Sequence, residues 1–354
     1  MRILFGYRYG IVGGVCTQLS ARLGAWTDPR CTFAFGELQG GEALLCERGT
    51  VVRSTPDDFR ARARDADAVV VIDTPEYLDA VEGAERPVLL EVHTTTERGL
   101  AYLERRGWCG HRIAVPSLAS AELLRERFGL PDAEVVGNVV DAERFRPLPA
   151  RGELPDRPIL AWVGKLDDHK NWQAFLELSA LLVHGGLDLE IFVVGGYTAP
   201  APIRRALVET ATALDVAGHL RWLPRIDHGA MPRFLAAVRA TGGLVVSTTR
   251  NESFGMSIAE ALACGVPVVA PRVGALPELA PDDAPYLSLY PPGDPSAAAE
   301  AVRALAPGRP ERAEADVLLE LDRPRLVEAW SPEAVARRYG ALLRSMVRED
   351  ARPR

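Results

Sequence analysis

The stretch that decides the fold reads Asn251-Glu252-Ser253-Phe254-Gly255-Met256-Ser257-Ile258-Ala259-Glu260 and continues through Ala261 to Leu279. Gly255 marks a helix start between two carboxylates, Glu252 and Glu260, and the apolar run 266–270 follows the helix. The first N–H groups of a helix lack intrahelical partners and carry the positive end of the helix dipole. The segment therefore combines donors suited to phosphate groups with carboxylates suited to hydroxyl groups.

The composition indicates a globular protein of two domains. The chain has 354 residues and a net charge of -7, which argues against wholesale nucleic-acid binding. Its five cysteines, which include Cys109, are scattered and form no Cys-x-x-Cys pair, so we expect no disulfide framework, no zinc site and a reducing cytoplasm. The opening residues are too short for a signal peptide, and no apolar run approaches the roughly 20 residues of a membrane span.

The first half of the chain alternates predicted strands and helices. Strands are predicted over residues 2–6, 68–72, 88–92, 113–115 and 134–136, and helices over 14–23 and 119–128, the latter with Ser117 as N-cap. This alternation predicts a mainly parallel sheet with helices on both faces. The proline-rich segment 147–158 has no periodicity and is predicted to be a linker.

The same alternation restarts after the linker. Strands are predicted over residues 159–163, 190–194, 219–222, 244–247 and 267–270, and helices over 172–184, 201–214, 231–240 and 255–263. Ser331-Pro332 predicts the start of a last helix, with Ser at the N-cap and Pro at the first helical position. Two doubly wound α/β units in tandem predict a cleft at the carboxyl ends of their strands.

The lysines are concentrated in one short segment. Of 41 basic residues only Lys165 and Lys170 are lysines, and both lie in Gly164-Lys165-Leu166-Asp167-Asp168-His169-Lys170-Asn171. Lysine is a compact, flexible point charge, whereas arginine is a planar fork. A site that requires the point charge would retain lysine while the rest of the chain uses arginine.

The segment 252–279 resembles the donor-binding signature of the retaining GT-B glycosyltransferases of family GT4. The matching blocks are Glu252-Ser253-Phe254-Gly255-Met256, Glu260-Ala261, Gly265-Val266-Pro267-Val268-Val269-Ala270 and Gly274-Ala275-Leu276-Pro277-Glu278, with Ala275 in place of a second glycine. The lysine segment matches the family's G-R-L and K-N pattern, with Lys165 in place of arginine. The resemblance implies two Rossmann-like domains facing across a cleft. It also implies an acceptor-side domain over residues 1–147, completed by the helix 331–354, and a donor-binding domain over residues 158–330.

The resemblance assigns roles to the residues of the donor site. It implies that Glu260 holds the ribose hydroxyls of a nucleoside diphosphate sugar and that Glu252 holds hydroxyls of the donor sugar. Lys165 and Lys170 are expected on the diphosphate. The other expected donor contacts are Phe254, Gly255, Met256, Ser257, Ile258, Arg225 and Ile226.

Two matches lie in the first half of the chain. Gly13-Gly14 resembles the family's N-terminal glycine pair, which lets backbone approach the diphosphate. His93 matches the histidine that faces the transferred sugar. His93, Glu252 and Lys170 are therefore the expected catalytic residues. Gly137 and Val139 replace the family's usual Pro and Gly, so the turn there is expected to differ.

The expected reaction moves a sugar from a nucleoside diphosphate to a hydroxyl group, with retention at the anomeric carbon. Lys165, Lys170 and the helix start would stabilise the leaving diphosphate, so no metal and no cofactor are expected. Asp167-Asp168 flanks the lysines and lacks a ligand cluster. Glu252 is the only carboxylate candidate for a nucleophile, and the resemblance assigns it to hydroxyl binding. We therefore expect same-face attack.

The acceptor side is expected in the first domain. Tyr7 and Tyr9 follow the predicted first strand, and Gln18 and Glu97 are further candidates. A soluble small molecule or oligosaccharide is the expected acceptor, in specialised-metabolite (antibiotic) or cell-envelope synthesis. Stacking on a sugar and loop anchoring are equally open roles for the two tyrosines.

Other activities share this fold and stay open. A sugar phosphorylase or a nucleotide-sugar epimerase would have the same architecture, and a non-catalytic sugar-nucleotide-binding subunit would share the donor site. A nicotinamide-dependent dehydrogenase is disfavoured because Gly10-Ile11-Val12-Gly13-Gly14 lacks the G-x-G-x-x-G spacing. The expected partners are a UDP-sugar, ahead of a GDP-sugar, and a soluble acceptor. The base, the donor sugar, the acceptor and the oligomeric state are not fixed by the sequence.

Overall fold

The computed structural model describes residues 1–11, 13–26, 28–105 and 112–350. The chain divides into unit 1, Met1–Val139 with Ala329–Arg354, and unit 2, Val140–Glu328. The passage from unit 1 to unit 2 therefore precedes the predicted linker 147–158. Val12, Cys109 and the last part of the predicted terminal helix, residues 351–354, lie outside the described residues.

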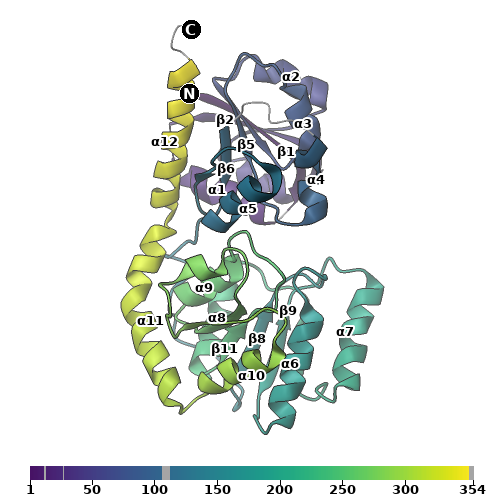
Figure 1. The fold of residues 1–354 in the computed structure, drawn as a ribbon, viewed down its shortest axis with the longest axis vertical. Helices are drawn as coiled ribbons and strands as arrows, with labels where there is room; N and C mark the ends of the chain where they lie inside the picture. The colour runs from purple at the N-terminus through teal and green to yellow at the C-terminus, as the bar shows by residue number, and fades with distance from the viewer. Residues whose placement is uncertain (12, 27, 106–111, 351–354) are drawn as a thin grey trace. The chain divides into compact units, whose positions relative to one another are not determined.

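Unit 1 is a doubly wound parallel sheet, as predicted (Figure 1). Its described strands, in the order β3-β2-β1-β4-β5-β6-β7, are all paired parallel to their neighbours. Their bounds are β1 Arg2–Ile11, β2 Arg30–Gln39, β3 Gly49–Arg53, β4 Ala68–Ile72, β5 Val88–Glu91, β6 Arg112–Val115 and β7 Glu134–Val135. The strand order reverses direction between β1 and β4, which is where doubly wound sheets bind ligands, at the carboxyl ends of the strands.

Helices cover both faces of this sheet. Their bounds are α1 Gly14–Gly24, η1 Gly41–Leu45, α2 Pro56–Ala63, α3 Pro75–Ala80, α4 Glu97–Arg105, α5 Leu118–Phe128 and α12 Pro332–Asp350. Successive residues of a strand point to opposite faces, so Ile3 and Phe5 join the core formed with α1 and α12. Leu4 joins the core formed with α2, α3, α4 and α5. The last helix of the described chain therefore completes the unit that the first strand begins.

A buried ion pair ties three of these elements together. Arg22 of α1 donates to Glu91 Oε1 of β5 at 2.7 Å, with side chains 1% and 3% exposed. Tyr339 of α12 donates its hydroxyl to Glu91 Oε2 at 2.8 Å, and the Arg22 guanidinium lies 4.3 Å from the Tyr339 ring centroid. Burial opposes ionisation of Glu91, but Arg22 and His93 hold the pKa of this carboxyl well below its usual range. Glu91 is therefore a carboxylate held by two helices.

Unit 2 repeats the architecture with a second parallel sheet (Figure 1). Its described strands follow the order β10-β9-β8-β11-β12-β13, with bounds β8 Ile159–Val163, β9 Glu190–Val194, β10 Leu220–Leu223, β11 Leu244–Val246, β12 Val268–Pro271 and β13 Leu287–Tyr290. Its helices are α6 Trp172–His184, α7 Ala201–Ala213, α8 Met231–Ala240, α9 Met256–Ala263, η2 Leu276–Leu279, α10 Pro295–Ala304 and α11 Pro310–Ala329. Within the described ranges, each helix is too short or too polar to cross a bilayer.

The strongest sequence predictions are confirmed and several elements were missed. The predicted ranges 68–72, 159–163 and 190–194 match β4, β8 and β9, and Ser117 caps α5 by accepting from the Ser120 N–H at 3.1 Å. The prediction that β1 ends at residue 6 is wrong, because β1 pairs with β2 as far as Ile11. The sequence analysis also missed β2, β3, β13 and the helices α2, α3, α4, α10 and α11.

Replacement of Tyr339 by phenylalanine tests the buried network. Tyr339→Phe leaves Glu91 Oε2 without its donor, so we expect the free energy of unfolding to fall by about 1.5–3 kcal/mol. Tyr197→Phe is the matched control, because Tyr197 is 48% exposed, and it should change stability by less than about 0.5 kcal/mol. Urea unfolding of both variants measures the difference, and equal stabilities would contradict the role of the network.

Candidate active site

Helix α9 opens with a glycine that no other residue replaces without strain. Gly255 is its N-cap, with φ of 92°, in the left-handed region. A Cβ at this position would lie 2.6 Å from Leu276 Cδ2. The chain therefore turns sharply from the loop after β11 into α9, as the sequence predicted for a helix start at Gly255.

A second glycine fixes the backbone around Glu252. Gly274 has φ of 49°, and a Cβ there would lie 2.2 Å from Asn251 Oδ1 and 2.3 Å from Glu252 O. The Glu252 carbonyl accepts the Ala275 N–H at 3.0 Å, and the Glu252 N–H donates to Asn251 Oδ1 at 2.8 Å. The loop after β12 therefore holds the Glu252 carbonyl, and the Asn251 side chain holds the Glu252 N–H group.

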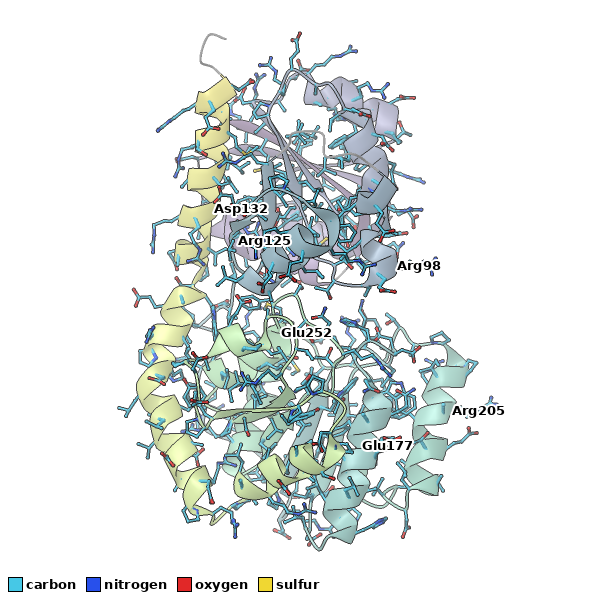
Figure 2. All side chains as sticks on the ribbon, viewed as in Figure 1. Arg98, Arg125, Asp132, Glu177, Arg205 and Glu252 are labelled. Carbon is cyan, nitrogen blue, oxygen red and sulfur yellow. The ribbon has the colours of Figure 1, made fainter. Side chains whose placement is uncertain are left out.

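Two predicted catalytic residues meet in unit 2. Lys170 Nζ donates to Glu252 Oε1, and the two side chains are 25% and 11% exposed. Figure 2 labels Glu252 in the loop that precedes α9. The Lys170 N–H donates to Asp167 Oδ1 at 2.8 Å, so Asp167 shapes the turn that carries the lysine. Asp167 acts here as a loop residue.

The turn that carries Lys170 is bonded to the loop that carries Glu252. Asn171 has a positive φ of 53° at the N-cap of α6. Thr248 donates to the Asn171 carbonyl at 2.8 Å and accepts from Trp162 Nε1 at 3.1 Å. Thr249 donates to the His169 carbonyl at 3.2 Å. These contacts explain how residues about 80 positions apart in sequence come together, and the sequence analysis did not identify the two threonines.

Lys165 follows β8 at a close approach of two strand ends. Its side chain is exposed and forms no ion pair among the residues that the structure describes. A Cβ on the neighbouring Gly195, whose φ is 125°, would lie 1.9 Å from the Gly164 carbonyl oxygen. Only glycine permits this close approach of the two backbones. Gly164 and Gly195 therefore place no side chain over the carboxyl ends of β8 and β9.

Glu260 has a partner that the sequence analysis missed. His228 Nε2 lies 2.9 Å from Glu260 Oε1, and Glu260 is 7% exposed. The His228 ring packs against Phe145 with centroids 5.0 Å apart. His228 lies in the loop after β10, which also carries Arg225 and Ile226. Glu260, the predicted ribose carboxylate, and the loop with the predicted donor contacts Arg225 and Ile226 therefore lie together in unit 2.

The remaining predicted donor residues differ in exposure. Arg225 is exposed, lies 5.2 Å from the Tyr197 ring centroid and pairs with Asp227 at 3.2 Å. Phe254 and Ile258 are buried, and the Ile258 N–H donates to the Gly255 carbonyl at 3.0 Å. The Ile258 amide is therefore used within the helix. Ser257 and Met256 are half-buried at the first turn of α9.

The glycines expected to approach the diphosphate from unit 1 form the start of α1. Gly13 is the N-cap, with an extended φ of -165°, and Gly14 is the first helical residue. A Cβ at Gly14 would meet nothing within 4 Å. Space above this helix start agrees with the predicted backbone approach, which stays a prediction.

His93 lies at the carboxyl end of β5. Its Nε2 lies 2.9 Å from Glu91 Oε1, and its backbone N–H donates to Asp73 Oδ2 at 3.0 Å. Burial raises the pKa of Asp73 to about 6, against the nearby His93 and its N–H group, which lower it. The sequence analysis identified His93 but missed Glu91 and Asp73. The pattern Glu-x-His, with both side chains on one face of a strand end, could have indicated the former.

The predicted acceptor residues lie in unit 1, in other positions than expected. Tyr7 and Tyr9 do not follow β1 but lie within it; Tyr7 is half-buried, and Tyr9 is 38% exposed with Arg8 5.1 Å from its ring centroid. Gln18 is 3% exposed, donates to the Val139 carbonyl at 3.0 Å and accepts the Val139 N–H at 2.5 Å. These two hydrogen bonds attach Val139, the last residue of the first segment of unit 1, to helix α1.

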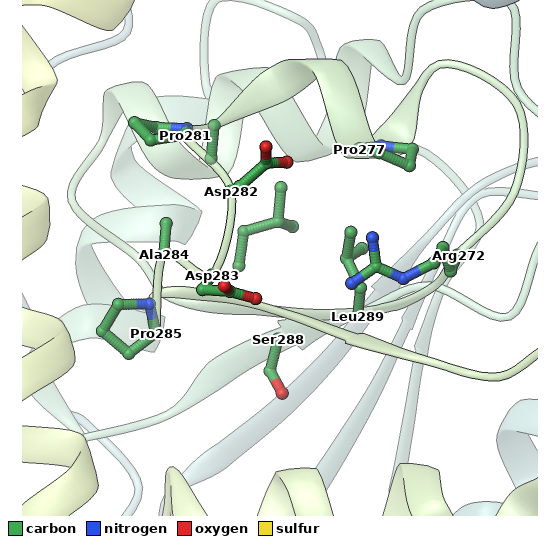
Figure 3. Close-up of a pocket in the computed structure, with 11 residues that line it drawn as sticks. Arg272, Pro277, Pro281, Asp282, Asp283, Ala284, Pro285, Ser288 and Leu289 are labelled. Atoms are coloured by element: carbon green, nitrogen blue, oxygen red, sulfur yellow. The ribbon is translucent and has the colours of Figure 1, made fainter.

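A pocket of about 240 Å³ lies elsewhere in unit 2 (Figure 3). It is lined by Arg272, which follows β12, by the 3-10 helix η2 and the loop after it, and by β13. Arg272, Asp282 and Asp283 contribute its charged side chains. None of the predicted site residues lines it. Among the described residues, no group of three His, Cys, Asp or Glu side chains could hold a metal ion, and Cys16, Cys31, Cys46 and Cys264 are unpaired.

Comparison with known proteins points to one family. The family model described as Glycosyl transferases group 1 matches residues 157–307. D-inositol 3-phosphate glycosyltransferase of Saccharomonospora viridis is 34% identical over 174 residues, which are 46% of this chain and 39% of that protein. 2-Deoxystreptamine N-acetyl-D-glucosaminyltransferase of Streptomyces fradiae is 29% identical over 218 residues, 60% of this chain and 46% of that protein. The chain spans less than half the length of these curated relatives.

Solved structures share the fold over almost the whole chain. Sucrose-phosphate synthase from Thermosynechococcus elongatus superposes with a TM-score of 0.80 at 18% identity and covers 99% of this chain and 100% of that chain. Anabaena Alr3699/HepE in complex with UDP-glucose superposes with a TM-score of 0.81 at 18% identity and covers 98% and 100%. At this identity the likeness concerns the fold.

The role of Gly274 in positioning Glu252 can be tested with two glycine substitutions. Gly274→Ala and Gly293→Ala both place a side chain at positive φ, but only Gly274 would meet backbone atoms; nothing lies within 4 Å of a Cβ at Gly293. We expect Gly293→Ala to cost about 1 kcal/mol of stability and Gly274→Ala at least about 2 kcal/mol more, through displacement of Asn251 and Glu252. Urea unfolding measures the stability of both variants. Equal losses of stability would show that Gly274 is required only for its positive φ and not for the close approach to Asn251 and Glu252.

The fold, the matched segment and the motifs agree with each other. Both units are doubly wound parallel sheets, and the segment 157–307 contains the lysine turn, the opening of α9 and Glu260. The predicted resemblance is therefore confirmed: residues 157–307 match the group 1 glycosyltransferases, and the chain has the GT-B fold of the solved structures.

Proposed function

We propose that the protein transfers a sugar from a nucleoside diphosphate donor to a hydroxyl group of a small polar acceptor, with retention at the anomeric carbon and without a metal ion or cofactor. The observation that carries the proposal is the contact of Lys170 with Glu252 at the opening of α9. This contact joins a phosphate-binding cation to a hydroxyl-binding carboxylate in one half-buried pair. The unpaired cysteines fit a reducing cytoplasm as the place of the reaction.

The leaving diphosphate would be held by cations and by a helix start. Lys165 is exposed after β8, Lys170 lies at the start of α6, and the N-terminus of α9 follows Gly255. Negative charge on the diphosphate grows as the bond to the sugar breaks, so these groups stabilise the transition state more than the ground state. This arrangement supplies the electrostatic role that a metal ion has in other transferases.

Donor binding would exchange the partners of Lys170. In the structure the ammonium group is bound to Glu252 Oε1. A diphosphate offers that ammonium a doubly charged alternative, which releases the Glu252 carboxylate to accept hydroxyl groups of the donor sugar. Glu260 can receive the ribose hydroxyls through Oε2, because His228 contacts its Oε1.

The choice of substrates follows the relatives. UDP and UDP-glucose are bound in solved structures of the same fold, so a UDP-sugar is the proposed donor, ahead of a GDP-sugar. Similar curated proteins are named for D-inositol 3-phosphate and for 2-deoxystreptamine. We therefore place the acceptor in this class of small polyhydroxylated rings, in specialised-metabolite or cell-envelope synthesis. The acceptor hydroxyl would attack the anomeric carbon from the face that the diphosphate leaves, which retains the anomeric configuration.

A ligand panel tests the donor. UDP, GDP, ADP and dTDP are each added to the full chain at 1000 times a micromolar Kd, where a selective ligand adds about 4 kcal/mol of stability. We expect UDP to raise the melting temperature most. Lys170→Ala should abolish this shift, and a shift that is equal for all four nucleotides, or absent, would contradict the proposed donor.

A second test separates binding from turnover. Glu252→Gln keeps the shape of the side chain but removes the charge, so we expect the UDP-induced thermal shift to persist while sugar transfer falls by at least about 100-fold. Glu177→Gln on the outer face of α6, also labelled in Figure 2, is the matched control, because Glu177 is exposed. Full transfer activity in Glu252→Gln would reject the role of Glu252, and product analysis with and without acceptor separates a transferase from a phosphorylase or an epimerase.

A further inference from the structure

Asp73 has an unusual backbone conformation at the switch point of unit 1. It directly follows β4 and has φ of 39°, in a region that residues other than glycine seldom adopt. Its Oδ2 accepts the N–H groups of His93 at 3.0 Å and of Thr94 at 3.1 Å. Backbone strain of about 1–3 kcal/mol persists only where the surroundings impose it. Two bonds therefore hold this carboxyl at the carboxyl ends of β4 and β5.

The other oxygen of Asp73 is not used by the fold. Oδ1 is buried and has no hydrogen-bond partner among the described residues. A buried acceptor without a partner costs about 1–3 kcal/mol, and more when it is charged. Such a group calls for an explanation, and a ligand that supplies the missing donor is one. Nothing in the proposed chemistry of Lys170 and Glu252 requires Asp73.

A second unsatisfied group lies within electrostatic range of the same carboxyl. The Tyr102 hydroxyl of α4 is also buried and has no partner among the described residues. Burial, and then the charge of Asp73, raise the pKa of the Tyr102 hydroxyl and of the Tyr7 hydroxyl above their usual value. The charge of Asp73 therefore acts on tyrosines of β1 and α4. Glu91, which is paired with Arg22, is a further acidic group near Asp73.

We infer that Asp73 Oδ1 and the Tyr102 hydroxyl form a subsite that binds hydroxyl groups of a polyhydroxylated ring, the acceptor of the transfer reaction. Asp73 accepts a hydrogen bond from one ring hydroxyl, and Tyr102 donates to a second oxygen of the ring. A carboxylate repels phosphate, so this subsite receives the hydroxyl-bearing edge of the ring. The inference rests on the proposed function, and it assigns that function's acceptor to named atoms of unit 1.

Asp73→Asn is the decisive variant. Asparagine tolerates positive φ, and its amide oxygen can accept the N–H groups of His93 and Thr94. Its NH₂ group then replaces Oδ1, so an acceptor becomes a donor while the turn is retained. Asp215→Asn is the matched control, because Asp215 has φ of 53° and is exposed in unit 2.

The probes are 2-deoxystreptamine and D-inositol 3-phosphate, each titrated calorimetrically into the full chain in the presence of UDP. We expect the wild type and Asp215→Asn to bind at least one probe, and Asp73→Asn to bind it 10- to 100-fold more weakly, with an unchanged Kd for UDP. Unchanged affinity in Asp73→Asn, or binding of neither probe to the wild type, would overturn the inference.

Sugar transfer is recorded in the same samples, so that the two proposals fail separately. Weaker probe binding in Asp73→Asn, with no transfer by the wild type, keeps the subsite and rejects the proposed function. Transfer by the wild type, with equal probe binding in the wild type and Asp73→Asn, rejects the subsite and keeps the proposed function.

Tyr102→Phe provides a second route if Asp73→Asn does not fold. We expect 3- to 10-fold weaker probe binding and an unchanged melting temperature, because the hydroxyl has no partner in the fold. A melting temperature lower by several degrees, with unchanged probe binding, would show that Tyr102 satisfies the fold itself, and the subsite would be rejected.

Discussion

The carboxylate of Glu91 is the constraint on which unit 1 depends. A carboxylate buried at the carboxyl end of a central strand costs several kcal/mol unless charge and hydrogen bonds compensate it. Arg22 supplies the charge and Tyr339 the second bond, so α1 and α12 are fixed to β5. His93 lies two residues further and contacts the same carboxylate. The position of a predicted catalytic histidine is thus set by a salt bridge between a strand and the first helix.

In unit 2 the predicted site residues are positioned by backbone conformation. Gly255, Gly274 and Gly195 each occupy a position where a Cβ would meet another part of the loop cluster. At Gly195 and Gly274 two loops approach each other through backbone atoms, and at Gly255 the helix start packs against Leu276 and Leu279. The side chains of Lys170 and Glu252 meet within this loop cluster.

The parts of the fold that the sequence predicted are those with a local signal. The runs that form β4 and β8 are apolar throughout because parallel strands are buried on both faces. The continuation of β1 through Tyr9 depends on its pairing with β2, which no local pattern shows. Helix α2 did have a local signal, since Thr55 caps it in a capping box with Asp58, and Pro56 occupies the first turn.

The site residues likewise include some with a local sequence signal and some without one. Glu252, Glu260 and the lysines were found because their spacing resembles a known motif, and the match of residues 157–307 to the group 1 glycosyltransferases supports that interpretation. His228, Asp73 and Thr248 were missed because their importance comes from contacts across 20 to 86 positions, from burial and from a positive φ. The bonds of Gln18 to Val139 were missed for the same reason, because the sequence around Gln18 gives no sign of them.

The return of α12 to unit 1 has a consequence for biosynthesis. Chains are made from the N-terminus, and domains generally fold as units as they emerge. The strands of unit 1 are made first, but Tyr339 is added only after all of unit 2 has been translated. During that interval one oxygen of Glu91 and the apolar face that receives Val335 and Leu343 lack their cover. Unit 2 can therefore complete its fold on the ribosome before unit 1, and residues 1–139 expressed alone form an unfinished domain.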